Sequence, residues 1–182
     1  GPDNILGFTT GLLTDTGSLF TGRFTVVGKS PLSGGWGDAN CGGYFSPFLK
    51  RCGIDAVFVY GASSKPVYIY IDNKGAEIKD AADLWGMDAV ASEEKLKERH
   101  GKRCQVATIG PAGEKLSRIA GISNDGGRLA ARCGLGGVMG SKKLKAIAVR
   151  GTKKPELKNP EAIQEIARWA ASHWKGLPGA AT

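Results

Sequence analysis

The distribution of glycine constrains this chain more than any other feature of its sequence. The chain has 182 residues and 28 glycines, about twice the usual share of roughly 7%. Many of them gather in two stretches, 34–43 and 126–140, so the chain is not a low-complexity sequence. Glycine lets the backbone approach a ligand closely and adopt positive φ without steric cost. The two stretches are therefore the first candidates for functional loops.

The second stretch runs from Gly126 to Lys145 and reads GGRLAARCGLGGVMGSKKLK. Arg128 and Arg132 lie among its glycines, and guanidinium groups bind phosphate through paired N–H donors. This combination favours a pocket for a large anionic ligand. A packed turn ahead of a short buried helix is the alternative that the string leaves open.

The overall charge is basic, at +8 with a pI of about 9.4. Such a balance permits nucleic acid or a membrane surface as a partner. The acidic residues are scattered among the basic ones, and no run of five basic residues occurs. This scatter argues against nucleic acid as a partner. No apolar run approaches the ~20 residues of a membrane span, so we expect no membrane insertion.

The cysteines form no recognisable metal-binding pattern. The four are Cys41, Cys52, Cys104 and Cys133. No C-x-x-C occurs, and the spacings match neither zinc nor iron–sulfur signatures. Without a recognisable signal peptide, the simplest interpretation is four reduced thiols in a cytoplasmic protein.

The hydrophobic pattern predicts an α+β fold of antiparallel or mixed sheets with short helices. The predicted strands cover residues 5–10, 23–27, 56–60, 67–71, 76–79, 103–109, 117–122 and 144–150. The predicted helices cover residues 44–52, 89–100 and 160–175, with a short helix or turn within 129–138. Asp88 is expected to cap the second helix, and Asn159 with Pro160 to start the last one. We expect the glycine-rich segment 32–43 to be a loop and residues 176–182 to be a frayed end.

Two segments repeat the same local order. Residues 42–61 and 134–151 each run from a glycine loop through a short helical segment and a lysine into an apolar strand. An internal pseudo-duplication would suit a ligand with two similar halves, and coincidence of common patterns is the alternative. The last predicted helix carries Trp169 and Trp174 and exposes enough apolar surface to pack on another domain.

Other polar residues give weaker signals. His100 and His173 have no partner at metal spacing and are expected on the surface or half-buried. Asp80, Asp83 and Asp88 are expected to be solvated. Cys41 is a candidate nucleophile only as the less favoured interpretation, because no histidine is near it in sequence. The natural anion contacts are Arg23, Lys29, Arg128 and Arg132. Lys29 and Lys145 fit equally well as ordinary surface residues beside strands.

Several strings in register resemble one known family. They are RFTVVGKSPLSG (23–34), DANCGGYF (38–45), LK (49–50), PVYIYI (66–71), IGPAGE (109–114), NDGGR (124–128) and GLGGVMGSKKLKAIAV (134–149). In order and spacing they closely resemble the amino-terminal domain of the tungsten-containing aldehyde ferredoxin oxidoreductases, over residues 1–151. The resemblance implies an α+β platform that holds tungsten, or molybdenum, bound by two pterins whose phosphates are bridged by magnesium.

The resemblance also implies roles for individual residues. The positions that match the family's pterin contacts are Arg23, Asn40, Gly42, Arg128, Leu129, Ala130 and Arg132. Arg23 matches the arginine between pterin and an iron–sulfur cluster, and the backbone carbonyls of Asn40 and Leu129 match magnesium ligands. The family often has R-A-A-G-R-G-G where this chain has RLAARCG (128–134), so Ala131 and Cys133 replace glycines and put close packing there in question.

The activity implied is oxidation of an aldehyde to a carboxylic acid, with water as the oxygen source. Electrons would pass through a 4Fe–4S cluster to ferredoxin. The family's cluster cysteines, a C-x-x-C-x-x-x-C set and a distant fourth, belong to helical domains that follow this one, and its first strands precede the position of Gly1. We therefore expect a metallopterin-binding domain over 1–151, truncated at its amino terminus. Residues 152–182 would form a linker and the start of a helical domain. We also consider a second copy of the enzyme, in a homo-oligomer, among its partners.

An incomplete enzyme of this kind should be inactive as an isolated chain. Its catalytic residues are not identifiable in these 182 residues. The alternative is a stand-alone pterin- or phosphate-ligand binding module, or a small subunit without catalysis.

Overall fold

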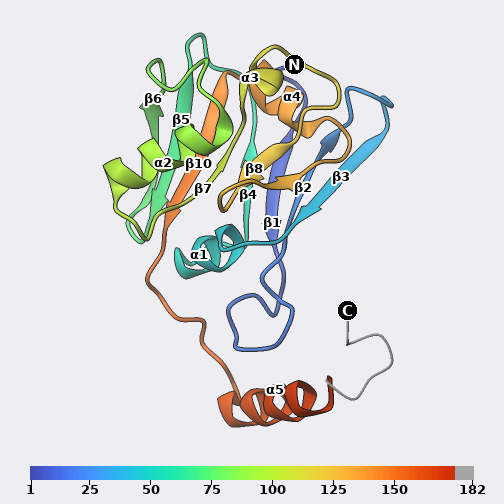
Figure 1. Ribbon diagram of the computed structural model, residues 1–182, viewed down its shortest axis with the longest axis vertical. Coiled ribbons are helices and arrows are strands. Elements are labelled where there is room, and N and C mark those ends of the chain that lie inside the picture. Colours follow the sequence, from blue (N-terminus) through green and yellow to red (C-terminus); the bar gives the residue numbers. More distant parts are fainter. Residues whose placement is uncertain (175–182) are drawn as a thin grey trace.

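The computed structural model describes residues 1–174 and contains two β-sheets with short helices (Figure 1). The strands are β1 (Leu6–Thr10), β2 (Phe24–Lys29), β3 (Trp36–Cys41), β4 (Ala56–Val59), β5 (Val67–Asp72), β6 (Gly75–Asp80), β7 (Gln105–Thr108), β8 (Ile122–Asn124), β9 (Arg128–Ala130) and β10 (Leu144–Arg150). The helices are α1 (Phe45–Arg51), α2 (Ala89–His100), α3 (Pro111–Glu114), α4 (Leu135–Ser141) and α5 (Pro160–Trp174).

The first sheet has the order β3-β2-β1-β4 and is antiparallel throughout. The second has the order β6-β5-β10-β7-β8-β9, in which β10 runs parallel to β5 and every other pair is antiparallel. The predicted α+β class with antiparallel and mixed sheets is therefore confirmed. The parallel pair requires a long crossover, which the segment from β6 to α4 supplies.

The main hydrophobic core lies between the two sheets. Phe8, Phe24 and Phe45 are almost fully buried there, and α1 and α4 each contact both sheets. A smaller cluster lies on the other face of the second sheet, where Leu96 of α2 is fully buried. Because both faces of β10 are covered, its residues 144–149 are buried without interruption, as expected for an interior strand.

Several local predictions are confirmed. The Asp88 side chain accepts a hydrogen bond from the Ala91 amide (2.9 Å) and caps α2. Pro47 lies in the first turn of α1, where its missing N–H costs nothing. The Asn159 side chain accepts from the Ala162 amide (3.0 Å) at the start of α5. Of the predicted tail, the structure describes nothing from residue 175 onward.

Two predictions around the glycine stretches were wrong. Residues 36–41 form the edge strand β3 rather than a loop. Gly37 pairs with Gly28 of β2. A Cβ on Gly37 would meet the side chains of Ser30 and Cys133, so glycine allows the strand to approach them closely. Residues 117–121 form a turn rather than a strand. The Ala120 carbonyl accepts from the Gly136 amide (2.9 Å), which docks α4 directly on this segment. The segment 129–138 divides into β9 and the start of α4.

The two segments that repeat the order of helix and strand lie in different settings. In 42–61 the strand is β4, at an edge of the first sheet, whereas in 134–151 it is β10, inside the second. The shared order is therefore local and does not extend to the position of the strand in its sheet.

Helix α5 lies apart from the sheets at the end of an extended segment (Figure 1). Ile166 and Trp169 are 65% and 61% exposed, and the Trp174 ring packs against Phe20 at a centroid distance of 5.2 Å. The expectation that this helix exposes much apolar surface is therefore confirmed. None of the described helices has the length and apolar character needed to cross a membrane.

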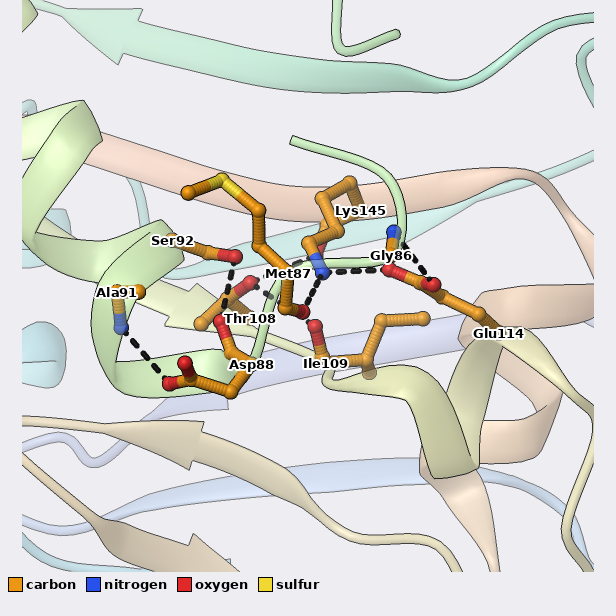
Figure 2. Close-up of polar contacts among 9 residues, drawn as sticks. All are labelled: Gly86, Met87, Asp88, Ala91, Ser92, Thr108, Ile109, Glu114 and Lys145. Carbon is orange, nitrogen blue, oxygen red and sulfur yellow. Dashed lines mark hydrogen bonds and ion pairs between the residues drawn. The ribbon is translucent and has the colours of Figure 1, made fainter. Parts of the chain in front are cut away.

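A buried ion pair lies where β10 meets α3 and the start of α2 (Figure 2). Lys145 Nζ donates to a Glu114 carboxylate oxygen (2.5 Å) and to the Met87 carbonyl (2.8 Å). The second oxygen of Glu114 accepts from the Gly86 amide (2.8 Å). The two side chains are 0% and 5% exposed. The interpretation of Lys145 as a surface residue was therefore wrong, because the lysine finds these partners inside the protein.

Candidate functional site

The edges of the two sheets meet where β3 ends and β9 begins. Strand β3 contacts β9, so the glycine pair after Cys41 lies beside the hairpin that carries Arg128. A Cβ on Gly43 would meet Asn124 Oδ1 at less than a contact distance and would lie 3.3 Å from the Arg128 side chain. The two glycine-rich stretches, far apart in sequence, therefore come together through their backbones.

Four of the predicted residues form what we call the two-arginine site: Arg23, Asn40, Gly42 and Arg128. The Arg23 Nε donates to the Asn40 side-chain oxygen, and its Nη2 donates to the Asn40 carbonyl (3.3 Å). A Cβ on Gly42 would lie 3.5 Å from Nη1 of Arg23 and 3.9 Å from Nη1 of Arg128. Both guanidinium groups thus approach the same bare stretch of backbone.

The two-arginine site carries more positive than negative charge. Arg128 Nε donates to Asp125 (3.1 Å), and the Arg128 side chain is 62% exposed. Arg23 is exposed and forms no ion pair with any residue that the structure describes. Its Nη1, like that of Arg128, remains available to an anion, and an oxyanion binds well to paired guanidinium donors.

The other predicted positions form no described side-chain hydrogen bond with the two-arginine site, and they differ in exposure. Leu129 follows Arg128 on β9, the last strand of its sheet, and its side chain is 49% exposed. Ala130, the last residue of β9, is fully buried. Arg132 is exposed, and within the described part of the chain it forms no ion pair. Lys29 lies at the opposite end of β2 from Arg23 and is not brought to the site.

Cys41 and Asn124 link the two loops beneath the arginines. Asn124 Nδ2 donates to Cys41 Sγ (3.0 Å), and both residues are buried. Burial raises the pKa of the Cys41 thiol, although Asn124, the two arginines and the Gly42 amide all act to lower it. The thiol therefore stays protonated at neutral pH, which counts against a nucleophilic cysteine.

Sequence reasoning did not select Asn124, which entered only as part of the string NDGGR that carries the family resemblance. Its side chain is fully buried, and its Oδ1 has no hydrogen-bond partner among the described residues. A buried unpaired amide oxygen is uncommon and marks a position with a specific constraint. Here the constraint is the close approach of Gly43.

The remaining titratable residues do not form a second site. Tyr68 bonds His100 (3.0 Å), and burial lowers the pKa of this half-buried histidine. His173 is exposed, so both histidines lie as predicted. Asp80 and Asp83 form surface ion pairs. Across residues 1–174, no group of three or more His, Cys, Asp or Glu side chains is positioned to hold a metal ion.

Comparison with known proteins assigns the chain to a family. Residues 1–151 match the family described as "Aldehyde ferredoxin oxidoreductase, N-terminal domain". A "Tungsten-containing aldehyde ferredoxin oxidoreductase" from Pyrococcus horikoshii is 48% identical over 168 residues, which cover 92% of this chain and 28% of the relative. An "Aliphatic sulfonate oxidoreductase, WOR-like subunit" from Pyrococcus furiosus is 33% identical, over 97% of this chain and 30% of the relative.

A solved structure has the same fold. It is described as "Active site complex BamBC of Benzoyl Coenzyme A reductase in complex with 1,5 Dienoyl-CoA", with a TM-score of 0.93 and 37% identity. The match covers 96% of this chain and 27% of that one. The chain thus spans little more than a quarter of the length of the proteins that it resembles. It belongs to the aldehyde ferredoxin oxidoreductase family and corresponds to the amino-terminal domain of that family.

Proposed function

We propose that this chain binds the phosphate groups of a tungsten- or molybdenum-carrying bis-pterin cofactor. The observation that carries the proposal is the two-arginine site, in which two guanidinium groups converge on the bare backbone of Gly42. The bridged phosphates of such a cofactor are compact and strongly anionic, so they fit open guanidinium donors beside a backbone without side chains. When bound, the cofactor would supply two-electron redox chemistry.

Each residue of the site has a distinct part in this proposal. Arg23 and Arg128 neutralise phosphate charge, and Gly42 admits the ligand to the backbone. The carbonyls of Asn40 and Leu129 are proposed as magnesium ligands. The Asn40 carbonyl already accepts from Arg23 (3.3 Å), which leaves its second lone pair for a cation. Ala130 and Arg132 complete the proposed contacts.

The names of the relatives support a role in cofactor binding rather than substrate binding. By name these oxidoreductases act on an aldehyde, an aliphatic sulfonate and a coenzyme A thioester. All three match nearly the whole of this chain. A domain shared among enzymes with such different substrates is best explained by a component that their reactions share, and tungsten appears in the names of several relatives.

The whole enzyme is proposed to oxidise an aldehyde to a carboxylic acid and to pass electrons through a 4Fe–4S cluster to ferredoxin. We place the boundary of the cofactor domain at residue 151 and assign 152–182 to a linker and the start of a helical domain. The exposed apolar side of α5 supports this assignment. A stand-alone pterin- or phosphate-binding module is the second candidate, because the two-arginine site is formed entirely by residues of this chain.

Cofactor content tests the proposal directly. The chain is produced with tungstate or molybdate in the medium, and pterin fluorescence and metal are measured on the purified protein. We expect pterin in the wild type and a loss of at least half of it in Arg128→Ala and Arg132→Ala. The control, Lys74→Ala, removes one exposed charge from the β5–β6 turn, at the sheet edge opposite β9. Unchanged pterin in both arginine variants would contradict the assignments.

Aldehyde oxidation with a redox dye separates the two candidates. We expect no turnover by the 182 residues alone, because they contain no cysteine set for a cluster. Turnover by the purified chain would contradict the proposal that the activity needs further domains.

A further inference from the structure

We propose that Glu93 of α2 is a positioning residue for Arg128, acting through the backbone of the turn between β8 and β9. This inference rests on the proposed function, because it concerns the same arginine. Neither the sequence patterns nor the comparisons point to Glu93. Three features of the turn support this role: its conformation, its attachment to α2 and its attachment to β3.

The turn before Arg128 has a left-handed backbone. Asp125, Gly126 and Gly127 have φ angles of 48°, 70° and 121°. The two glycines adopt such angles without steric cost, and Asp125 is the residue of the three that has a Cβ. The Gly127 amide donates to the Asn124 carbonyl (3.2 Å) and closes the turn. Because two glycines leave the backbone free to adopt other conformations, contacts from other elements help to fix this one.

Glu93 provides the first external contact. Its Oε2 accepts from the Gly126 amide (3.1 Å), and its Oε1 pairs with Lys97 Nζ one turn along α2 (2.5 Å). The Glu93 side chain is only 2% exposed, whereas Gly126 itself is exposed. A buried carboxylate is costly unless it is paired and hydrogen-bonded. Both Glu93 oxygens are used, and one of them is committed to a single amide of this turn.

The bond between Asn124 and Cys41 provides the second contact, from the opposite side. It joins the first residue of the turn to the end of β3 (3.0 Å). The turn is therefore held between α2 and β3. Asp125 lies between these two attachments, and its carboxylate accepts from Arg128 Nε (3.1 Å). The path from Glu93 to the guanidinium runs through Gly126, Asp125 and Arg128.

The proposed role depends on the reach of the Glu93 side chain rather than on its charge. A glutamine at position 93 keeps an oxygen for the Gly126 amide but loses the negative charge and the bond to Lys97, whose side chain is 28% exposed and can be solvated instead. An aspartate keeps the charge but withdraws it by one carbon–carbon bond, ~1.5 Å. If Glu93 acts by holding the Gly126 amide, Glu93→Asp should disturb Arg128 and Glu93→Gln should not. If only its charge or a general stabilising effect matters, the order is reversed or the two variants are equal.

The experiment compares Glu93→Gln and Glu93→Asp in the 182-residue chain, with Glu94→Asp as the control because Glu94 is exposed on the same helix. NMR follows hydrogen exchange of the Gly126 amide and the Nε–H resonance of Arg128, and a titration with inorganic pyrophosphate measures affinity. In Glu93→Asp we expect exchange at least tenfold faster, a shifted Arg128 resonance and three- to tenfold weaker pyrophosphate binding. Glu93→Gln and Glu94→Asp should match the wild type.

An unshifted Arg128 resonance in Glu93→Asp would overturn the inference, as would equal shifts in both Glu93 variants. The two resonances decide the matter whether or not pyrophosphate binds. A wild-type chain without pyrophosphate affinity would therefore count against the proposed function alone.

Discussion

The molecule places cationic side chains in two different environments, one buried and one exposed. At the buried ion pair, Lys145 is fully enclosed and bonds to both Glu114 and the Met87 carbonyl (Figure 2). At the two-arginine site, Arg23 and Arg128 are exposed, and the Nη1 of each lies close to the backbone of Gly42. The ammonium of Lys145 therefore donates to groups inside the fold, whereas the two arginines keep N–H donors available to a ligand.

This difference shows which cations are structural and which are available for binding. A buried charge loses hydration and must be compensated by the protein, so removing one member of a buried pair is costly. An exposed guanidinium contributes little to stability, since surface ion pairs are worth only about 0–1 kcal/mol. Mutation should therefore affect stability at one location and binding at the other.

The largest effect is expected at Lys145. The variant Lys145→Met leaves the Glu114 carboxylate buried and unpaired, which should lower the free energy of unfolding by about 3–5 kcal/mol. Urea denaturation measures this change. The double variant Lys145→Met/Glu114→Gln removes the orphaned charge and keeps an acceptor for the Gly86 amide, so it should recover about half of the loss. A single variant within about 1 kcal/mol of wild type would show that the pair does not have the structural role assigned to it.

A smaller loss is expected where the two glycine stretches touch. Gly43 has a φ of +112°, and a Cβ there would overlap Asn124 Oδ1, so Gly43→Ala should cost about 3 kcal/mol from strain and overlap together. The matched control is Gly34→Ala, at φ +74° but with nothing near the added Cβ, which should cost about 1 kcal/mol. The same denaturation experiment compares them. Equal losses would mean that the loops are not in close contact.

A pH-dependent effect on stability is expected from Cys104, which is fully buried in the smaller hydrophobic cluster. Burial raises the pKa of Cys104, under α2, from 9.0 to about 12. Between these values the unfolded chain has lost the proton that the folded chain keeps, so stability should fall as pH rises above 9. The slope should be about 1.4 kcal/mol per pH unit from this thiol. Unfolding at pH 8, 9 and 10 should show a shallower decline in Cys104→Ala, and an unchanged slope would contradict the assignment.

Much of the fold could be predicted from the sequence because its signals are local. The apolar run of β10, the Asp88 cap and the first-turn Pro47 each depend on neighbouring residues, and each is confirmed. The strand β3 was not predictable, because its glycines serve contacts with residues distant in sequence. Gly37 makes room for Ser30 and for Cys133, which lies almost a hundred residues away.

The residues of the candidate site could also be predicted only in part. The motifs indicated Arg23, Asn40, Gly42 and Arg128, and the fold brings these four together. Sequence patterns gave no reason to select Asn124 or Glu93, because their partners are a buried sulfur and one backbone amide on other elements. Lys145 was misplaced for a related reason: a lysine beside a strand resembles a surface residue until Glu114 is placed opposite it.

The most direct test of the account is the affinity of the chain for inorganic pyrophosphate, measured by calorimetry on the wild type, Arg128→Ala and Lys74→Ala. We expect Arg128→Ala to weaken binding at least tenfold, because a hydrogen bond to a charged group contributes about 1.5–3 kcal/mol. Its stability should change by less than about 0.5 kcal/mol. Lys74→Ala should bind within twofold of the wild type. Equal weakening in the two variants would show only a general attraction to a basic surface and would contradict a specific two-arginine site.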